Sequence, residues 1–292
     1  MLNYFRALGF STYTREDHIL PLLTDVHENP DYIECCDLKD TTFVTMEKDI
    51  MEDSGIGIFG SYDAYDRFQI EYYYVYHKTK EVSGKEVCLI IHLNGKEAFQ
   101  VTTDDTRLGV PLHYYLINTN GFFDAVNEAY DPNQALNYHL SALSLSGSIL
   151  LPLLKDTETK KRSDSFYDRR KEACDGARRG KPMAYDAFLG FEEALHQMTE
   201  KQSRMMDLYS IIDTSFIPVN EAEGDYKVLA EITDVKLHKN PITREECYLL
   251  SLKACDIPFE LLINKMDLLG EPLVGRRFLG QIHLQGYIDF PV

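Results

Sequence analysis

The clearest hydrophobic pattern in the sequence runs through residues 184–212. Mostly apolar side chains recur there at alternating spacings of three and four residues: Phe188, Phe191, Leu195, Met198, Gln202, Met205, Tyr209 and Ile212. This spacing is typical of a helix with a narrow apolar stripe. Pro182, just ahead of it, suits the first turn of a helix. The pattern therefore predicts one long helix over residues 184–209.

The stripe of this helix has two uses. Most amphipathic helices bury their stripe against their own protein, and we favour that interpretation. A regular seam with one polar member, Gln202, also fits a helix pair in which the polar residue sets the register. This second use predicts a homodimer through Phe188, Phe191, Leu195, Met198, Gln202 and Met205.

Before this helix, apolar and polar positions alternate as they do in β-strands. Residues 68–76 predict a strand with one aromatic face, which we expect to pack in a core rather than to stack bases or sugars. Asn94-Gly95 predicts a tight hairpin between strands at 87–93 and 96–102. Ser146-Gly147 predicts a second hairpin.

Three shorter helices are expected in the same half of the chain. One spans residues 3–8 and ends at Gly9, and another covers residues 122–130. The third begins at Thr14 and Asp17, which resemble a capping box, and contains Pro21, which should kink it or move its start. The first half thus predicts an antiparallel sheet with helices.

After the long helix, the pattern is again that of strands. Apolar positions alternate from Tyr226 to Ile232 and then change parity at Val235, which predicts a bulge near Thr233 and Asp234. Glycines recur through the last stretch and mark tight bends. We therefore predict an α+β chain of three parts: an α+β domain at 1–155, a basic connector with the long helix at 156–212, and a small β-barrel, similar to an OB fold, at 213–292.

Residues 55–60 match the pattern G-x-G-x-x-G. That pattern holds a pyrophosphate only where it joins a strand to a helix, and here it is followed by a polar turn and another strand. Six acidic residues surround it and would repel phosphate: Glu47, Asp49, Glu52, Asp53, Asp63 and Asp66. We expect strands and a turn here rather than a dinucleotide site.

The net charge of −17 works against nucleic-acid binding unless one face is basic. Residues 155–181 hold ten Lys or Arg against six Asp or Glu. Because their basic clusters alternate in direction along a helix, we interpret this stretch as a solvated connector. The alternative is nucleic-acid binding by these clusters together with the C-terminal barrel, with Lys265, Arg276 and Arg277 on phosphates and Phe278 or Tyr287 as a stacking surface.

Location follows from what the sequence lacks. No basic and apolar leader opens the chain, and the most apolar stretch, residues 142–154, is shorter than the roughly 20 residues that cross a bilayer. We therefore expect a cytoplasmic protein without a membrane partner. Its six cysteines contain no C-x-x-C and should be reduced thiols.

No motif for a hydrolase, zinc protease or phosphate loop occurs, so the sequence predicts no catalytic, cofactor-binding or metal-binding residue. The function itself is not fixed by the sequence. The favoured hypothesis is a non-catalytic interaction or scaffold protein that binds itself or another protein. An enzyme with an acidic pocket near Asp63 and Asp66 is a further alternative.

Several stretches together resemble one known family. They are Phe5-Arg6-Ala7-Leu8-Gly9-Phe10-Ser11, residues 55–60 running into 68–76, residues 208–214, and, most specific, residues 263–272 continuing through Gly275-Arg276-Arg277-Phe278 to Leu284-Gln285-Gly286. The chain is identified by them as a member of an uncharacterised family of Gram-positive bacterial proteins, a domain of unknown function. The resemblance covers nearly the whole chain and implies a bacterial, cytosolic protein. It brings no activity, cofactor or catalytic residue.

Overall fold

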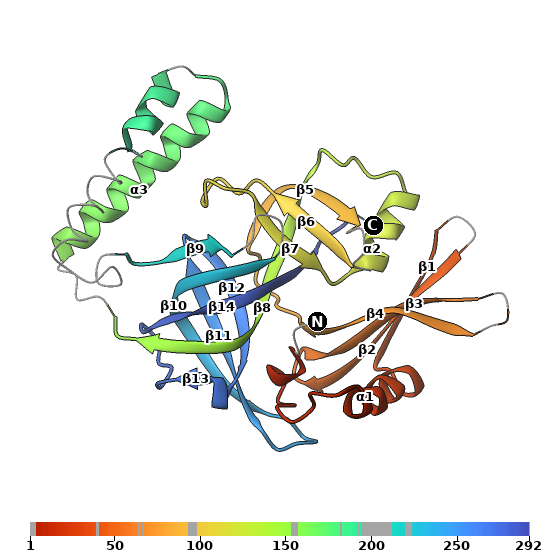
Figure 1. Cartoon of the computed structure of the whole chain (residues 1–292). Helices are drawn as coiled ribbons and strands as arrows, with labels where there is room; N and C mark the ends of the chain where they lie inside the picture. The colour runs from red at the N-terminus through yellow and green to blue at the C-terminus, as the bar shows by residue number, and fades with distance from the viewer. Residues whose placement is uncertain are drawn as a thin grey trace.

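The computed structural model describes residues 4–291 except 39–40, 64, 66, 93–97, 153–156, 182, 192, 194–211 and 220–223. The fold is α+β and consists mainly of strands, which form two sheets (Figure 1). The smaller one, called the small sheet below, is built from four consecutive antiparallel strands: β1 (Tyr32–Leu38), β2 (Thr41–Met51), β3 (Ser54–Tyr62) and β4 (Phe68–His77).

The second sheet, called the large sheet below, has ten strands drawn from both halves of the chain. They are β5 (Gly84–His92), β6 (Phe99–Thr103), β7 (Leu112–Leu116), β8 (Ala135–Leu150), β9 (Ser215–Pro218), β10 (Asp225–Lys239), β11 (Glu246–Ala254), β12 (Ile257–Asn264), β13 (Leu268–Leu269) and β14 (Arg277–Ile288). Most neighbours are antiparallel, while β8 pairs in parallel with β12 and β13, and β7 with β14. Strands of the predicted first and third parts thus share one sheet.

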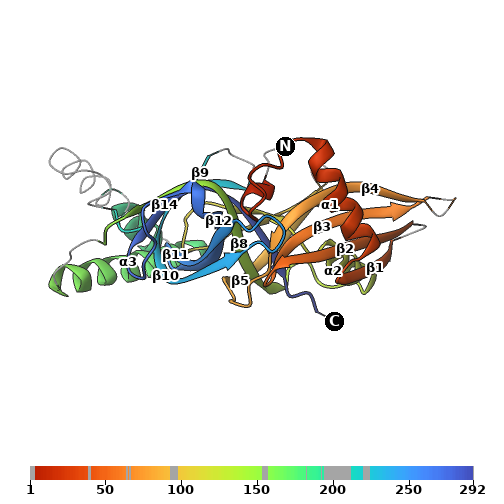
Figure 2. The ribbon, with the colours of Figure 1, turned by 90° about the horizontal axis from the view of Figure 1, so that it is seen from below.

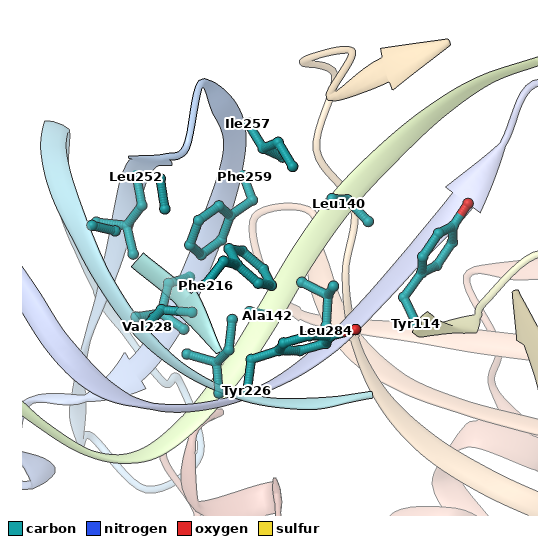
Figure 3. Close-up of a cluster of buried hydrophobic side chains, with 14 of the residues drawn as sticks. Tyr114, Leu140, Ala142, Phe216, Tyr226, Val228, Leu252, Ile257, Phe259 and Leu284 are labelled. Carbon is teal, nitrogen blue, oxygen red and sulfur yellow. The ribbon is translucent and has the colours of Figure 1, made fainter. Parts of the chain in front are cut away.

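Pairing in the large sheet returns on itself. From β10 it passes to β11, β12, β8 and β14, and β14 pairs again with β10. The side chains inside this closed run of strands are the main core of the protein. Figure 3 shows Phe216, Tyr226 and Phe259 pointing toward one another there, and all three are buried. Burial of such rings is the main stabilising contribution expected in this region.

Two helices cover the small sheet. Helix α1 (Glu16–Glu28) crosses one face of it, as Figure 2 shows, and α2 (Thr119–Asn127) lies against β1. Asn120 and Asn127 of α2 donate hydrogen bonds to the carbonyls of Glu34 and Asp37. These bonds cover part of the exposed edge of β1, which would otherwise be open to another strand.

The start of the chain is tied to its C-terminal third. A 3₁₀ turn, η1 (Tyr4–Arg6), places Arg6 over Asp267 of the 3₁₀ turn η3 (Lys265–Asp267), and two guanidinium nitrogens donate to its carboxylate at 2.6 Å each. The amide of Asn240 donates to the carbonyl of Leu8 at 2.8 Å. Two of the stretches that carry the family resemblance therefore meet in space.

The predicted hairpin at Ser146-Gly147 is wrong. Both residues lie inside the single strand β8, and a Cβ at Gly147 would stand 2.3 Å from the ring of Phe278. The glycine serves close packing of an aromatic ring rather than a turn.

The aromatic face predicted for residues 68–76 is divided by a bulge. The pairing of β3 with β4 shifts between Phe59 and Gly60, so Phe68 packs with the α1 core while Tyr72 packs on the opposite face, with Phe59 and Phe123. An extra residue in one strand reverses which positions share a face. Core packing of most of these rings is confirmed, and Tyr76 is fully buried.

Other local expectations have mixed outcomes. The bulge expected near Thr233 is confirmed by a register shift between Ile232 and Asp234. Strands β5 and β6 pair antiparallel, as the predicted hairpin requires, but His92 lies opposite Phe99, two residues beyond the partner that a two-residue turn at Asn94-Gly95 would give it. The turn itself lies outside the described residues. The capping box at Thr14 is wrong, because α1 starts after Arg15 without a side-chain cap.

The region of the predicted connector and long helix is helical where it is described. Helix α3 (Thr157–Arg178) extends away from both sheets in Figure 1, and residues 183–191 and 193 are helical as well. Among the described helices, none has both the length and the apolar character needed to cross a membrane.

Candidate functional site

A cleft of about 220 Å³ lies where the small sheet meets the outer face of the large sheet, and it is called the cleft below. Polar residues dominate its walls. It is lined by Glu52, Asp53, His77, Lys78, Thr79, Lys80, Glu81, Lys236, His238, Leu249 and Glu260.

His77, the last residue of β4, joins the two sheets in the cleft. Its Nδ1 lies 2.8 Å from the hydroxyl of Ser54 on β3, and its Nε2 lies 2.8 Å from a carboxylate oxygen of Glu260 on β12. Both Ser54 and His77 are 2% exposed. Burial acts to raise the pKa of Glu260, but hydrogen bonds from His77 and Thr79 outweigh it and hold that pKa below its ordinary value.

The hydrogen-bonded row of Ser54, His77 and Glu260 resembles the catalytic triad of a hydrolase, but its serine is not placed to attack a substrate. Ser54 does not line the cleft, and its hydroxyl also donates to the carbonyl of Glu52 at 3.2 Å. Both ring nitrogens of His77 are bonded, as they are in a working triad, but Ser54 and His77 are each only 2% exposed, so the serine hydroxyl is closed off from a substrate in the cleft. A nucleophile must reach its substrate and a base must be able to receive its proton. The row therefore fixes the position of His77.

Further hydrogen bonds hold the end of β4 on the large sheet. Ser141 donates to the carbonyl of His77 at 2.6 Å. With its side-chain amide turned to satisfy both partners, Gln285 donates to the carbonyl of Val75 at 2.9 Å and accepts from the amide of His77 at 3.0 Å. The floor of the cleft is thus built on paired polar groups from β4, β8 and β14.

The turn between β2 and β3 forms one wall. Glu52 and Asp53 make this turn, and Asp53 adopts a positive φ of 53°. The amide of Lys78 donates to the carbonyl of Asp53 at 2.8 Å, which holds the turn beside the chain that leaves β4. This wall contributes two carboxylate side chains and no cation.

Strand β10 forms the facing wall with Lys236 and His238. The bulge at Thr233 is the reason that these residues face the cleft. Before it, even-numbered residues such as Val228 and Ile232 point into the core, and after it the even positions point outward.

His238 is unusual among the residues of the cleft. Its Nε2 is one of two buried side-chain atoms that have no hydrogen-bond partner among the described residues, the other being Asn120 Oδ1. Burial lowers the pKa of His238, so its ring is neutral near neutral pH. A neutral imidazole nitrogen can donate or accept a hydrogen bond, depending on the tautomer.

Lys78 lines the cleft, but its ammonium is engaged by other side chains of the protein. Its ammonium pairs with the carboxylate of Glu47, which also accepts a hydrogen bond from Tyr74 at 3.0 Å, and it lies 5.2 Å from the ring centre of Tyr32. Burial raises the pKa of Glu47, and Lys78 and Tyr74 only partly offset this. Among the described residues, no group of three or more His, Cys, Asp or Glu is arranged to hold a metal ion.

Comparison with known proteins decides the family. A sequence profile described as "Domain of unknown function, E. rectale Gene description (DUF3881)" matches residues 5–286. The chain belongs to the DUF3881 family. This confirms the near-full-length resemblance to a family of unknown function. No curated protein matches the DUF3881 chain, and no solved structure does.

The residues predicted to contact nucleic acid are not part of the cleft in this DUF3881 protein. Lys265 pairs with Glu246 at 2.6 Å, and Arg276 donates to the carbonyl of Glu271 at 2.8 Å. The guanidinium of Arg277 is buried and donates to the carbonyls of Leu151 and Ile212, and Phe278 is fully buried in the core. The ring of Phe278 therefore offers no surface to a base in this conformation.

The candidate helix seam is described only in part. Phe188 and Phe191 are helical and partly buried, and the guanidinium of Arg170 lies 5.5 Å from the ring centre of Phe188. Leu195, Met198, Gln202 and Met205 lie outside the described residues. The proposed dimer interface stays a prediction.

The glycine pattern at residues 55–60 lies within strand β3, between two strands. A Cβ at Gly57 would stand 2.3 Å from the ring of Tyr74, and one at Gly55 would stand 2.7 Å from the hydroxyl of Tyr76. These glycines let tyrosines of β4 lie flat across β3. No helix follows β3 to direct an N-terminus at a phosphate, as that motif requires.

Sequence reasoning did not single out His77, His238 or Glu260. The sequence held a signal for His238 alone, namely the change of parity after Ile232, which sets the direction in which Lys236 and His238 point. Asp63, named in the enzyme hypothesis, accepts bonds from the amides of Tyr65 and Arg67 and shapes the turn between β3 and β4.

Proposed function

We propose that this protein is a non-catalytic binding protein and that the cleft between its two sheets binds a small polar molecule. The observation that carries the proposal is His238, which lines the cleft and whose buried Nε2 has no hydrogen-bond partner among the described residues. Buried polar groups are nearly always hydrogen-bonded, and an exception calls for an explanation. A ligand that bonds to this nitrogen is such an explanation.

The position of the cleft supports the same function. Ligand sites form preferentially between structural units, where walls from distant parts of the chain converge. Here the walls come from the turn after β2, the chain after β4, and strands β10 and β12. A molecule in the cleft would touch both sheets at once.

The absence of catalysis is part of the proposal. A hydrolytic site needs a nucleophile and a base that both face the substrate. Among the described residues, the hydroxyl that bonds to a histidine of the cleft is that of Ser54 on His77, and Ser54 is 2% exposed and does not line the cleft. Binding therefore fits the geometry better than turnover does.

Finer points of the earlier expectations also stay proposals. The closed run of strand pairings supports a small barrel, and its likeness to an OB fold is a prediction. A cytoplasmic location is supported by six cysteines that are all free thiols. A homodimer through residues 184–209 is tested by sedimentation, where monomer alone at micromolar concentration would contradict it.

The binding function is tested by thermal denaturation of the full-length chain in the presence of a library of small polar metabolites. At least one compound should raise the melting temperature, because a ligand that binds only the folded state stabilises it. His238→Ala should abolish that rise while leaving the unliganded melting temperature close to wild type, since the lost nitrogen has no partner to leave behind.

Lys227→Ala is the matched control. Lys227 is an exposed lysine on the same strand as Lys236 but lies outside the cleft. It should retain the full ligand-induced rise. A library in which no compound shifts the melting temperature would contradict the proposed function.

A further inference from the structure

We propose that the ligand of the cleft is a small zwitterion, an α-amino acid with an aliphatic side chain. The inference rests on the proposed function and adds the chemical class of the ligand. It is carried by charged groups of both signs that line the cleft and have no ion pair among the described residues.

One wall presents negative charge. The carboxylates of Glu52 and Asp53 line the cleft and have no hydrogen bond or ion pair to any other described residue. Both lie close enough to His238 to influence its titration. An ammonium group placed here would meet two uncommitted carboxylates.

The facing wall carries the ammonium of Lys236 on β10 and the carboxylate of Glu260 on β12, which is bonded to His77 and lies near enough to Lys236 for their charges to interact. Lys236 lies two residues before His238 on the same side of β10, and it too has no ion pair among the described residues. Lys80, next to Glu81 on the chain after β4, is exposed and also has no ion pair among the described residues. A carboxylate placed here would meet Lys236 and could accept a hydrogen bond from the neutral ring of His238.

The two walls together exclude ligands of a single charge sign. A simple anion would be attracted to Lys236 but repelled by Glu52 and Asp53. A simple cation would be attracted to Glu52 and Asp53 but repelled by Lys236. A molecule that carries both charges satisfies both walls, and such complementarity is a main source of binding specificity.

Size and the remaining wall narrow the class further. The volume of about 220 Å³ is below the roughly 300–1,000 Å³ that is typical of sites for drug-sized ligands, so the occupant is small. Leu249, which is 5% exposed, contributes a small apolar contact among the polar groups of the lining. An aliphatic side chain of amino-acid size would pack against it.

The test compares three probes of one shape on the wild-type chain by calorimetric titration. L-leucine carries both charges, 4-methylpentanoate lacks the ammonium, and isopentylamine lacks the carboxylate. L-leucine or another aliphatic L-amino acid should bind, and its two single-charge counterparts should bind at least about tenfold more weakly, as expected for the loss of one charged contact.

Charge-removing variants assign each wall. The double variant Asp53→Asn, Glu52→Gln should lower the affinity for the amino acid. The difference in affinity between the amino acid and the matching carboxylic acid should then be smaller than in the wild type. Lys236→Gln should also lower the affinity for the amino acid, and it should reduce the difference in affinity between the amino acid and the matching amine. Lys227→Gln, on the same strand outside the cleft, should change neither of these differences in affinity.

The outcomes separate the inference from the proposed function. If other small molecules bind in a His238-dependent way and no amino acid does, the inference is overturned and the proposed function stands. Equal affinity for the amino acid and either single-charge probe also overturns the inference. If no small molecule binds, the proposed function fails, and the inference fails with it.

Discussion

The two sheets of this protein are assembled in different ways. The small sheet joins four consecutive strands by short turns, so that every neighbour in space is also a neighbour in sequence. The large sheet places β8 between β12 and β14, and its members range from Gly84 to Ile288. Contacts between distant residues form only after long loops close, whereas hairpins form locally. We therefore expect the large sheet to carry the global stability and the small sheet to open more independently.

The largest effect should come from removing a ring from the core of the large sheet. Phe278→Ala should lower the free energy of unfolding by about 3–5 kcal/mol, because the buried ring also fills the space over Gly147. Chemical denaturation followed by circular dichroism measures the loss.

Phe59→Ala is the counterpart in the small sheet. Phe59 is 1% exposed and stacks on Phe43 and Tyr72. Its loss should reduce hydrogen-exchange protection in β1–β4 much more than in β10–β14. Equal loss of protection in both sheets would show a single cooperative unit and break the comparison.

A smaller effect is expected from filling space under a tyrosine. Gly57→Ala places a Cβ 2.3 Å from the ring of Tyr74 and should cost about 1–3 kcal/mol of unfolding free energy. In combination with Tyr74→Ala, the cost should be less than the sum of the two single changes, because the clash is removed.

Gly190→Ala provides the control for that change. Gly190 is helical, and a Cβ there would meet no atom of the described residues within 4 Å. This substitution should stabilise the protein by up to about 1 kcal/mol. If Gly57→Ala is equally harmless, then β3 does not need its glycine for the tyrosine ring.

Acidification should change the stability contributed by one glutamate of each sheet in opposite directions. The pKa of Glu260 is lowered in the folded state, so its contribution to stability is present above the ordinary pKa of a glutamate and is lost as pH falls through the folded value. Glu260→Gln should cost about 1 kcal/mol at neutral pH. That difference should shrink in acid, as measured by denaturation across pH.

Glu47 in the small sheet should behave in the reverse way. Its pKa is raised, so the stability associated with its neutral form is present below the ordinary value and is lost as pH rises through the folded one. Glu47→Gln should therefore gain stability relative to wild type as the pH rises toward neutral. The same slope for both variants would show that burial does not dominate at Glu47.

The smallest effect concerns the thiols. Cys35 on the edge strand β1 is exposed, whereas Cys36 beside it is buried, and burial raises the pKa of Cys36 to about 12. In the large sheet, burial raises the pKa of Cys247 to about 12 as well. Iodoacetamide should modify Cys35 of the native protein well before these two, because the thiolate is the reactive form.

Cys35→Ser should remove this fast phase and change the free energy of unfolding by less than about 0.5 kcal/mol. Fast labelling of Cys247 would show that the large sheet opens as readily as the edge of the small one. Mass spectrometry of the alkylated peptides distinguishes the sites.

Local pattern was sufficient for much of the fold. Alternating residues predicted most strands, the change of parity after Ile232 predicted the bulge in β10, and the sequence context of residues 55–60 excluded a phosphate loop. Each of these depends on interactions within a few residues, which sequence spacing expresses directly. The family resemblance was also contained in the sequence alone.

Tertiary structure decided the remainder. Ser146-Gly147 has the composition of a turn, but the ring of Phe278 makes it part of a continuous strand. The pairing of His77 with Glu260 joins residues 183 positions apart, and the pairing of β10 with β11 and β14 brings His238 to the same cleft. Spacing along the chain cannot express such contacts, because side chains brought together by long-range strand pairing carry no local pattern. The candidate site is therefore a product of the assembled fold.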